Sequence, residues 1–307
     1  MQVEECRVAI SFENRVALVT GAGTGLGRSH ALMLAGRGAQ VVVNDPATDA
    51  DGNSAAQAVV DEIVSAGGRA IANTGSVASK EAAQEMVDLA VSEFGKIDIL
   101  INNAGILRDR SFAKSDMDDF DLVIAVHLLG SAYCSRAAFP VMKENNFGRI
   151  VMTTSNSGLY GNFGQANYSA AKAGLIGLMN TLAIEGAKNN ILVNSLAPMA
   201  ATAMTEGGMP QELLDRFHPE YASAGALMLA SEEFTETGVI LSAAAGHYAR
   251  VRVTSSPGFQ FAADSVSPDE VLAKWADISD ASGTMEFASA AEEVAYVAKR
   301  TVPGAAQ

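Results

Sequence analysis

The sequence predicts an α/β domain built on a doubly wound parallel sheet, with helices on both faces and a helical extension at the C-terminus. Two observations lead to this class. Short β-branched apolar segments alternate with longer segments of helical periodicity from residue 16 to residue 244, and this alternation is typical of parallel strands joined by crossover helices. The short segments are apolar throughout rather than at every second residue, as expected for strands covered on both faces.

Seven strands are expected along the chain. They lie at residues 16–20, 40–45, 69–73, 98–102, 149–155, 191–197 and 238–244. Each intervening segment is rich in Ala, Leu, Glu and Met and is long enough for a helix that crosses the sheet. Neither a linker rich in Pro, Gly and Ser nor a repeat of fixed period interrupts the series. Residues 1–258 are therefore predicted to form one domain.

The pattern changes near residue 258, where SSPGFQF is rich in turn-forming residues. Two further helices are expected beyond it, in SPDEVLAKWADIS and in MEFASAAEEVAYVAKR. The first begins with a serine cap, a proline in the first turn and acidic residues near the N-terminus. Residues 259–307 are therefore predicted to be a helical extension of the same domain.

The composition is that of an ordinary globular protein, with 49% hydrophobic and 18% charged residues. The formal net charge of −14 repels phosphate backbones, so nucleic acid is not an expected partner. The sequence shows neither a long apolar run nor a basic leader followed by one, so no membrane span is expected and a cytoplasmic location is predicted. Cys6 and Cys134 show neither disulfide nor metal-ligand spacing, and no metal site is expected.

A glycine-rich loop follows the first expected strand and opens a helix. In TGAGTGLGRSH the spacing is T-G-x-x-x-G-x-G, with glycines at Gly21, Gly25 and Gly27 and with Leu26 between the last two. Glycine permits positive φ and lets a pyrophosphate approach the backbone amides at a helix N-terminus, where the helix dipole favours negative charge. The loop therefore predicts a Rossmann-like dinucleotide site.

The second expected strand ends at Asp45, 24 positions after Gly21. A carboxylate at this place can accept hydrogen bonds from the adenine ribose hydroxyls and would repel a 2′-phosphate. No Lys or Arg stands at 22, 24 or 46 to neutralise such a phosphate, so NAD is the expected cofactor. The alternative left open is that Asp45 only begins the turn DPATDADGN.

Further motifs complete a pattern with the glycine loop. NNAG lies at 102–105, Ser155 stands thirteen residues before Tyr168, and Lys172 stands four residues after it. Together they resemble the short-chain dehydrogenase/reductase family over residues 14–250. A closer likeness, in NNAGILRDRSF, AVHLLGS and NFGQANYSAAKAG, is to the (3R)-hydroxyacyl-CoA dehydrogenase units of the peroxisomal multifunctional enzymes type 2, also called 17β-hydroxysteroid dehydrogenases type 4, and to their stand-alone bacterial relatives.

The resemblance implies an NAD-dependent oxidoreductase that interconverts a secondary alcohol and a ketone. Tyr168 would act as the general acid/base, and Ser155 would hydrogen-bond the reacting oxygen. Lys172 would hold the nicotinamide ribose and lower the pKa of the phenol, which is ordinarily about 10. Tyr168 would contact the cofactor as well. Ser157 is the reserve candidate for the role of the serine.

The same resemblance implies the remaining nucleotide contacts. They are Ser76 and Val77 at the adenine, Asn103, Ala104 and Gly105 at the adenine ribose and sheet edge, and Pro198 and Thr202 at the nicotinamide amide. The chain departs from the family pattern where Gly75 replaces a common acid and Met199 replaces a common glycine. It also has His127 where many members have an asparagine that anchors a proton-relay water. His127 is either an alternative relay or a packed core histidine, and both interpretations are left open.

The expected substrate is a (3R)-hydroxyacyl-CoA with a fatty or steroid side chain, and a 17β-hydroxysteroid is a second candidate. The alternatives are a 3-oxoacyl-carrier-protein reductase, which normally prefers NADPH, and a non-catalytic NAD-binding module. By the same resemblance, residues 203–225 would form a mobile substrate lid. The protein would be a homodimer or homotetramer paired through helices near 116–140 and 166–189.

Overall fold

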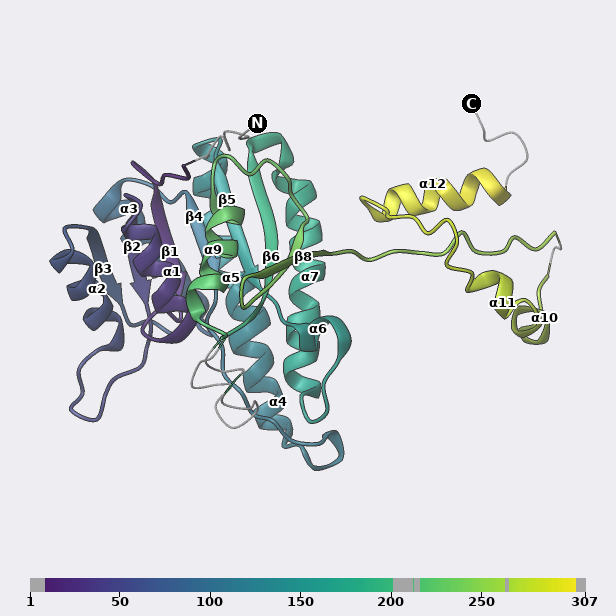
Figure 1. Ribbon diagram of the computed structural model, residues 1–307, viewed down its shortest axis with the longest axis horizontal. Coiled ribbons are helices and arrows are strands. Elements are labelled where there is room, and N and C mark those ends of the chain that lie inside the picture. The colour runs from purple at the N-terminus through teal and green to yellow at the C-terminus, as the bar shows by residue number, and fades with distance from the viewer. Residues whose placement is uncertain (1–8, 201–211, 213–215, 263–264, 302–307) are drawn as a thin grey trace. The chain divides into compact units, whose positions relative to one another are not determined.

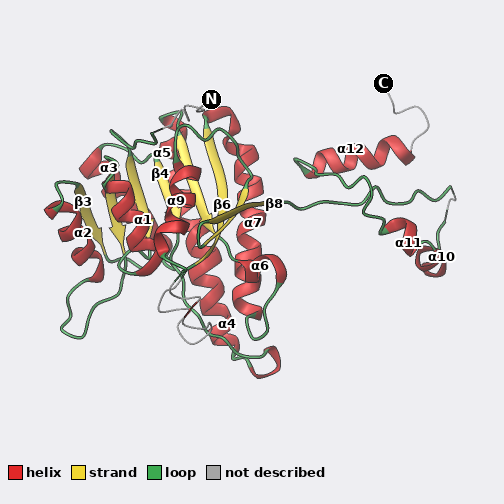
Figure 2. Cartoon of the chain, in the orientation of Figure 1, coloured by secondary structure: helices red, strands yellow, loops and turns green. Residues whose placement is uncertain are grey.

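The computed structural model describes residues 9–200, 212, 216–262 and 265–301. The chain divides into two compact units, Met1–Arg250 and Val251–Gln307. The first unit is a sheet between two layers of helices, as Figures 1 and 2 show. The predicted α/β class with a Rossmann-like sheet is thus confirmed, while the predicted single domain with an extension from residue 259 stays a prediction.

Seven strands of the described chain occupy the predicted segments. They are β1 (Val16–Thr20), β2 (Gln40–Asn44), β3 (Arg69–Asn73), β4 (Ile99–Asn102), β5 (Gly148–Thr153), β6 (Ile191–Met199) and β7 (Ile240–Ala244). The sheet order is β3-β2-β1-β4-β5-β6-β7-β8, and the first seven strands pair in parallel. The chain runs outward from β1 to β3 and then returns to the other side of β1 with β4. The loops after β1 and β4 are therefore neighbours at the carboxyl edge of the sheet.

The eighth strand, β8 (His247–Val251), is not predicted from the sequence. Ala245 and Gly246 join it to β7 in a two-residue turn, with φ angles of 48° and 79°. Two consecutive residues with positive φ are typical of a tight β-hairpin. The side chains of β8 are exposed or half-buried, so no continuous apolar segment marks this strand in the sequence.

Helices cover both faces of the sheet. One layer consists of α1 (Gly25–Ala35), α2 (Ala55–Ser65) and α9 (Pro219–Ala230), and the other of α3 (Lys80–Phe94), α5 (Gly130–Glu144) and α7 (Ala166–Gly186). Alternate strand residues such as Val19 and Ile101 pack against the first layer. Their neighbours Leu18 and Leu100 are also fully buried. The central strands are thus shielded from solvent on both sides, as their apolar sequences predict.

The helical run Met117–Glu144 consists of α4 (Met117–Ile124), a π-helical turn and α5. It is the one described segment long and apolar enough, by length and composition, to cross a membrane, and its mean hydropathy is 1.4. In this structure Cys134 and Met142 of α5 are fully buried in the domain, and α5 contacts α3, β4 and β5. The buried apolar residues of α5 therefore belong to the core of the first unit.

The unit Val251–Gln307 contains α10 (Pro268–Ala273), α11 (Trp275–Ile278) and α12 (Ala290–Thr301). The predicted cap is confirmed, because the Ser267 hydroxyl accepts a hydrogen bond from the Glu270 N–H and the Glu270 carboxylate accepts one from the Ser267 N–H. The helix predicted over SPDEVLAKWADIS is divided between α10 and α11.

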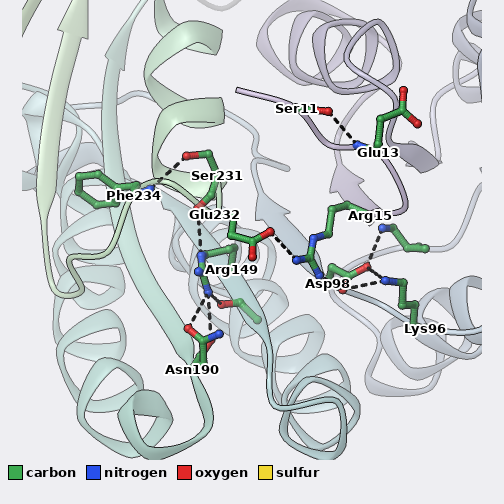
Figure 3. A network of polar contacts seen from close by, with 12 residues as sticks. Ser11, Glu13, Arg15, Lys96, Asp98, Arg149, Asn190, Ser231, Glu232 and Phe234 are labelled. Atoms are coloured by element: carbon green, nitrogen blue, oxygen red, sulfur yellow. Dashed lines mark hydrogen bonds and ion pairs between the residues drawn. The ribbon is translucent and has the colours of Figure 1, made fainter. Parts of the chain in front are cut away.

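A network of hydrogen bonds and ion pairs joins the amino ends of the central strands (Figure 3). The buried carboxylate of Asp98 accepts a hydrogen bond from the Val16 N–H at 2.8 Å and pairs with Arg15 at 3.1 Å and Lys96 at 3.0 Å. Arg15 also pairs with Glu232 at 2.7 Å. Because Arg15 precedes β1 and Asp98 precedes β4, this ion pair joins the two neighbouring strands where they begin.

Phe147 contacts two guanidinium groups in the same network. The Cζ atoms of Arg15 and Arg149 lie 3.6 and 4.3 Å from its ring centroid. Arg149 is buried, and it donates hydrogen bonds to the carbonyl oxygens of Ser231 and Asn190. Burial lowers the pKa of Arg149 to about 10, so the guanidinium stays charged at neutral pH. Its charge is stabilised by the aromatic ring and by backbone dipoles.

Replacement of Asp98 by Asn removes a buried charge that has two cationic partners. We expect the free energy of unfolding to fall by about 3 kcal/mol, because the partners lose their counter-charge. Glu232→Gln is the matched control, since this carboxylate is 67% exposed and its loss should change stability by no more than about 1 kcal/mol. Urea denaturation measures both variants. Equal losses would contradict the central place of Asp98 in the network.

Candidate active site

The loops that follow β1 and β4 are joined by hydrogen bonds. The side-chain amide of Asn103 donates to the carbonyl oxygens of Thr20 and Gly21, both at 3.0 Å. The Thr20 hydroxyl in turn accepts from the N–H groups of Asn103 and Ala104 at 3.0 and 3.1 Å. The glycine loop and the NNAG segment therefore form one continuous surface at the carboxyl edge of the sheet.

Close backbone contacts explain the glycines of the loop. Gly21 and Gly25 have φ angles of 62° and 54°, which a residue with a Cβ rarely adopts. A Cβ on Gly27 would lie 2.1 Å from the carbonyl oxygen of Gly21. The Thr24 side chain makes no cap hydrogen bond with α1, and the first turn of α1 contains no acidic residue. The first amides of this helix, including that of Leu26, thus suit the pyrophosphate of a dinucleotide.

Asp45 lies beside the glycine loop and is largely buried. Its Oδ2 accepts a hydrogen bond from the Gly23 N–H at 2.9 Å, and its Oδ1 accepts one from the Ala47 N–H at 2.9 Å. Asp45 therefore begins the following turn and is also hydrogen-bonded to the glycine loop. Its predicted contact with a ribose stays a prediction.

The predicted adenine contacts differ in exposure, since Ser76 is exposed and Val77 is buried. Gly75, which stands where the family commonly has an acid, is held by two asparagines. Its carbonyl oxygen accepts from the Asn44 side chain at 2.8 Å, and its N–H donates to the Asn73 side chain at 2.9 Å. Sequence reasoning missed this asparagine pair, because neither residue belongs to a motif with a recognised spacing.

Ser155 follows β5 and caps the short helix α6 (Asn156–Tyr160), which is not predicted from the sequence. Its hydroxyl accepts a hydrogen bond from the Ser157 N–H at 3.1 Å and donates one to the Asn156 side chain at 3.0 Å, and Ser155 is close enough to Tyr168 to lower the pKa of the phenol. The hydroxyl of Ser157, the reserve candidate, donates instead to Gln165 at 2.8 Å. The structure thus brings together the serine and tyrosine that the thirteen-residue spacing selects.

Lys172 is buried one helical turn after Tyr168 on α7. Its Nζ lies 5.5 Å from the centroid of the tyrosine ring and donates to the carbonyl oxygen of Thr153 at 2.5 Å. The Thr154 hydroxyl donates to the carbonyl oxygen of Lys172 at 2.7 Å. A Cβ on Gly158 would lie 2.7 Å from the Cβ of Lys172. The small residues of TTSNSG therefore let α6 pack closely against the lysine.

Burial dominates the protonation of this pair. It lowers the pKa of Lys172 to about 7. It also raises the pKa of Tyr168, while Ser155 acts in the opposite direction. Burial is thus the largest effect on the phenol, and the predicted lowering of its pKa by Lys172 stays a prediction. A bound oxidised nicotinamide ring would add a positive charge that favours the phenolate.

His127 lies in the π-helical turn Ala125–Leu129 and is buried. Its ring meets that of Tyr168 edge-on, with the centroids 5.1 Å apart, and its Nε2 lies 2.8 Å from the carbonyl oxygen of Ile106. Burial lowers the pKa of His127 to about 3, and the charge of Lys172 acts in the same direction. The imidazole is therefore neutral at pH 7, tightly packed, and in contact with the tyrosine.

The remaining site residues lie at the ends of β4 and β6. A Cβ on Gly105 would lie 2.3 Å from the Cε1 of His127. The last residue of NNAG is therefore a glycine, because any side chain there would clash with the histidine ring. Pro198 pairs with Ala243 near the carboxyl end of β6. Thr202 lies outside the described residues, as does most of the predicted lid. Among the described residues, no group of three or more His, Cys, Asp and Glu side chains is arranged to hold a metal ion.

The carboxyl edge of the sheet thus contains the glycine loop, the Ser155 hydroxyl, the Tyr168 phenol and the Lys172 amine. Hydride transfer to or from an alcohol carbon requires groups of these kinds. They define an oxidoreductase that acts on CH–OH groups with a nicotinamide cofactor. A family model described as short chain dehydrogenase matches residues 15–212. The chain belongs to the short-chain dehydrogenase family.

Three relatives illustrate the similarity. The peroxisomal multifunctional enzyme type 2 of Drosophila melanogaster is 46% identical over 92% of this chain and 48% of its own length. A short-chain type dehydrogenase/reductase of Mycobacterium tuberculosis is 46% identical over 88% of this chain and 96% of its own. A hydroxyacyl-CoA dehydrogenase of the same organism is 37% identical, over 87% and 89%. The chain thus spans about half the length of the multifunctional relative.

Solved structures agree with these sequence relationships. The structure of the full-length Drosophila enzyme superposes with a TM-score of 0.81 at 40% identity, over 95% of this chain and 50% of that one. A 7α-hydroxysteroid dehydrogenase complexed with NADH and 7-oxo glycochenodeoxycholic acid superposes with a TM-score of 0.70 at 31% identity, over 77% and 95%. The likeness therefore extends to a structure in which a nicotinamide cofactor is bound.

Lys172→Met should change how stability depends on pH. The folded-state pKa of Lys172 is about 7, below the value of about 10.4 in an unfolded chain. Between these values the unfolded chain binds more protons, so wild-type stability gains about 1 kcal/mol per pH unit as pH rises. We expect the stability of the variant to lack this gain. The free energy of unfolding of the variant, relative to that of wild type, should therefore be highest at pH 6. Denaturation at pH 6 to 9 without nucleotide measures the difference, and parallel curves would contradict the assignment.

Proposed function

We propose that the protein is an NAD-dependent dehydrogenase that interconverts a (3R)-hydroxyacyl-CoA and the corresponding 3-ketoacyl-CoA. The acyl group is a fatty or steroid side chain, and a 17β-hydroxysteroid is the second candidate substrate. The observation that carries the proposal is the buried Lys172, whose Nζ lies 5.5 Å from the ring centroid of Tyr168 one helical turn away, with Ser155 close enough to lower the pKa of the phenol. The substrate class is supported by the similarity to a hydroxyacyl-CoA dehydrogenase.

In the proposed oxidation, Tyr168 removes the hydroxyl proton of the substrate while the carbon loses a hydride. A bound nicotinamide would supply the hydride acceptor for this oxidation and the hydride donor for the reverse reaction. Ser155 donates a hydrogen bond to the substrate oxygen and so keeps it beside the phenol. In the reduction, the neutral phenol gives its proton to the developing alkoxide. Lys172 favours the phenolate through its charge when it is protonated.

The choice of NAD over NADP rests on Asp45. Hydrogen bonds from Gly23 and Ala47 hold its carboxylate beside the glycine loop. In the proposed complex the adenine ribose lies against this carboxylate, so a 2′-phosphate would meet a negative charge that is only slightly exposed. Like charges brought together in this way cost several kcal/mol. This argument also disfavours a carrier-protein reductase that depends on NADPH.

We extend the proposal to a homodimer or homotetramer paired through helices near 116–140 and 166–189. Its support is a set of exposed apolar side chains on these helices, which are Met117, Leu122, Leu129 and Ile184. Exposed apolar side chains that adjoin one another are typical of a contact with another subunit. The cytoplasmic location stays a prediction from the sequence.

Tyr168→Phe should abolish turnover without loss of nucleotide binding. The variant removes the proton donor and acceptor, so we expect kcat for a (3R)-hydroxyacyl-CoA with NAD to fall by about 10³-fold or more. Tyr160→Phe is the control, because Tyr160 is exposed on α6 and its hydroxyl has no proposed role. Steady-state assays of NADH formation and a fluorescence titration with NADH provide the two readouts. Full activity in Tyr168→Phe would end the proposed assignment.

Asp45→Asn should weaken the preference for NAD. Wild type is expected to favour NAD over NADP by about 100-fold in kcat/KM, because of the repulsion described above. The asparagine keeps an oxygen that can accept from the Gly23 N–H and loses the acceptor for the Ala47 N–H, so the contact with the glycine loop remains while the charge is removed, and we expect the preference to fall at least tenfold. Asp51→Asn makes the same charge change on an exposed turn residue and should leave the ratio unaltered. A wild type that prefers NADP would contradict the role of Asp45.

A further inference from the structure

A polar bridge joins the loop after β4 to the start of α7. The side-chain amide of Gln165 donates to the carboxylate of Asp109 at 2.7 Å, and its oxygen accepts from the Ser157 hydroxyl at 2.8 Å. Gln165 directly precedes α7 and stands three residues before Tyr168. We call this contact the Asp109–Gln165 bridge. It links an exposed carboxylate to the helix that carries the proposed general acid/base.

Contacts on either side of the bridge hold the same two segments together. The Arg110 N–H donates to the carbonyl oxygen of Gly164 at 2.8 Å, and the side-chain amide of Asn167 donates to the carbonyl oxygen of Arg108 at 3.1 Å. Asn167 is buried, and its side-chain oxygen accepts from the N–H of Tyr168 at 2.7 Å. The three consecutive loop residues 108–110 are therefore hydrogen-bonded to the residues that directly precede Tyr168.

The phenol of Tyr168 is surrounded by groups of different charge. Lys172, on the same helix, lies 5.5 Å from the ring centroid, and the neutral ring of His127 approaches from the π-helical turn. Ser155 approaches from the end of β5, and Asp109 contributes a negative charge from the loop after β4. Burial and then Asp109 raise the pKa of the phenol, whereas Ser155 lowers it. Among the described residues, Asp109 is the carboxylate that acts on the phenol.

We infer that Asp109, held by Gln165, is a positioning residue for Tyr168 that fixes the start of α7 against the loop after β4, and that its charge acts on the phenol. The inference rests on the proposed function, because it assumes that Tyr168 transfers the proton. A nearby negative charge disfavours a phenolate. Contacts before and after the bridge restrict the movement of the phenol relative to the substrate oxygen. Proton transfer is sensitive to this distance. Asp109 therefore supports the acid form that donates a proton to a ketone.

Asp109→Asn tests the charge. The asparagine oxygen can still accept from the Gln165 amide, so the bridge remains while the negative charge is lost. We expect the rising limb of the pH profile of kcat for alcohol oxidation to move to lower pH by about half a unit or more at low salt. Asp121→Asn is the matched control, because Asp121 is exposed on α4 and its side chain makes no hydrogen bond or ion pair with the described residues. An unmoved limb in Asp109→Asn would overturn the inference.

A donor–acceptor exchange tests the bridge. Gln165→Glu places a second carboxylate against Asp109, so the two side chains repel each other, and we expect kcat to fall about tenfold with little change in KM for NAD. In the double variant Asp109→Asn/Gln165→Glu, the asparagine amide can donate to the new carboxylate, and the total charge equals that of wild type. We expect kcat of the double variant to recover to within about threefold of wild type. A double variant as slow as Gln165→Glu alone would overturn the positioning role.

A spectroscopic titration separates this inference from the proposed function. The ultraviolet absorbance of tyrosinate is followed against pH for wild type and Asp109→Asn, and the curve of Tyr168→Phe in each background is subtracted to isolate Tyr168. We expect the isolated titration to move to lower pH in Asp109→Asn. If wild type turns over none of the offered alcohols, the proposed function fails while this shift still supports the action of Asp109 on the phenol. If turnover is normal and the titration does not move, the inference fails alone.

Discussion

Helices cover both faces of the parallel sheet, and this constraint decides where chemistry can take place. Strands buried on both sides present only their ends to solvent, so groups that must meet a ligand gather in the loops at one edge. At the amino edge the charged groups form ion pairs with one another or hydrogen bonds with the backbone, as Asp98 and Arg149 show. At the carboxyl edge lie the glycine-rich loop after β1 and Ser155 after β5. The fold thus separates the edge that supports stability from the edge that supports catalysis.

Burial at the carboxyl edge has two consequences for the reacting groups. It favours the neutral forms of Tyr168, Lys172 and His127, so the site contains few charges of its own near pH 7. A poorly solvated site also screens the remaining charges weakly, and each has a larger effect than it would have in water. The protonation of the phenol can therefore respond to the arrival of a positive nicotinamide ring and to a carboxylate such as Asp109.

The sequence predicted those features that short segments determine by themselves. Seven strands were located because each is a continuous apolar run, and the serine, tyrosine and lysine were proposed as a site because their spacing is characteristic of a family. The strand β8, the helix α6 and the π-helical turn were missed, since they depend on a hairpin turn, a serine cap and packing against α7. Contacts such as that of Asn103 with Thr20, or of Gln165 with Asp109, join residues far apart in the chain. No local pattern encodes such pairs.

The tight contact between Gly105 and His127 also restricts the order in which this site can evolve. A side chain at residue 105 meets the imidazole ring at once, because even a Cβ would lie 2.3 Å from it. Replacement of His127 by a smaller residue removes that obstacle, whereas the opposite order passes through an intermediate with a steric clash. A lineage that carries this histidine is therefore committed to the glycine, and any route to a different pair begins at position 127.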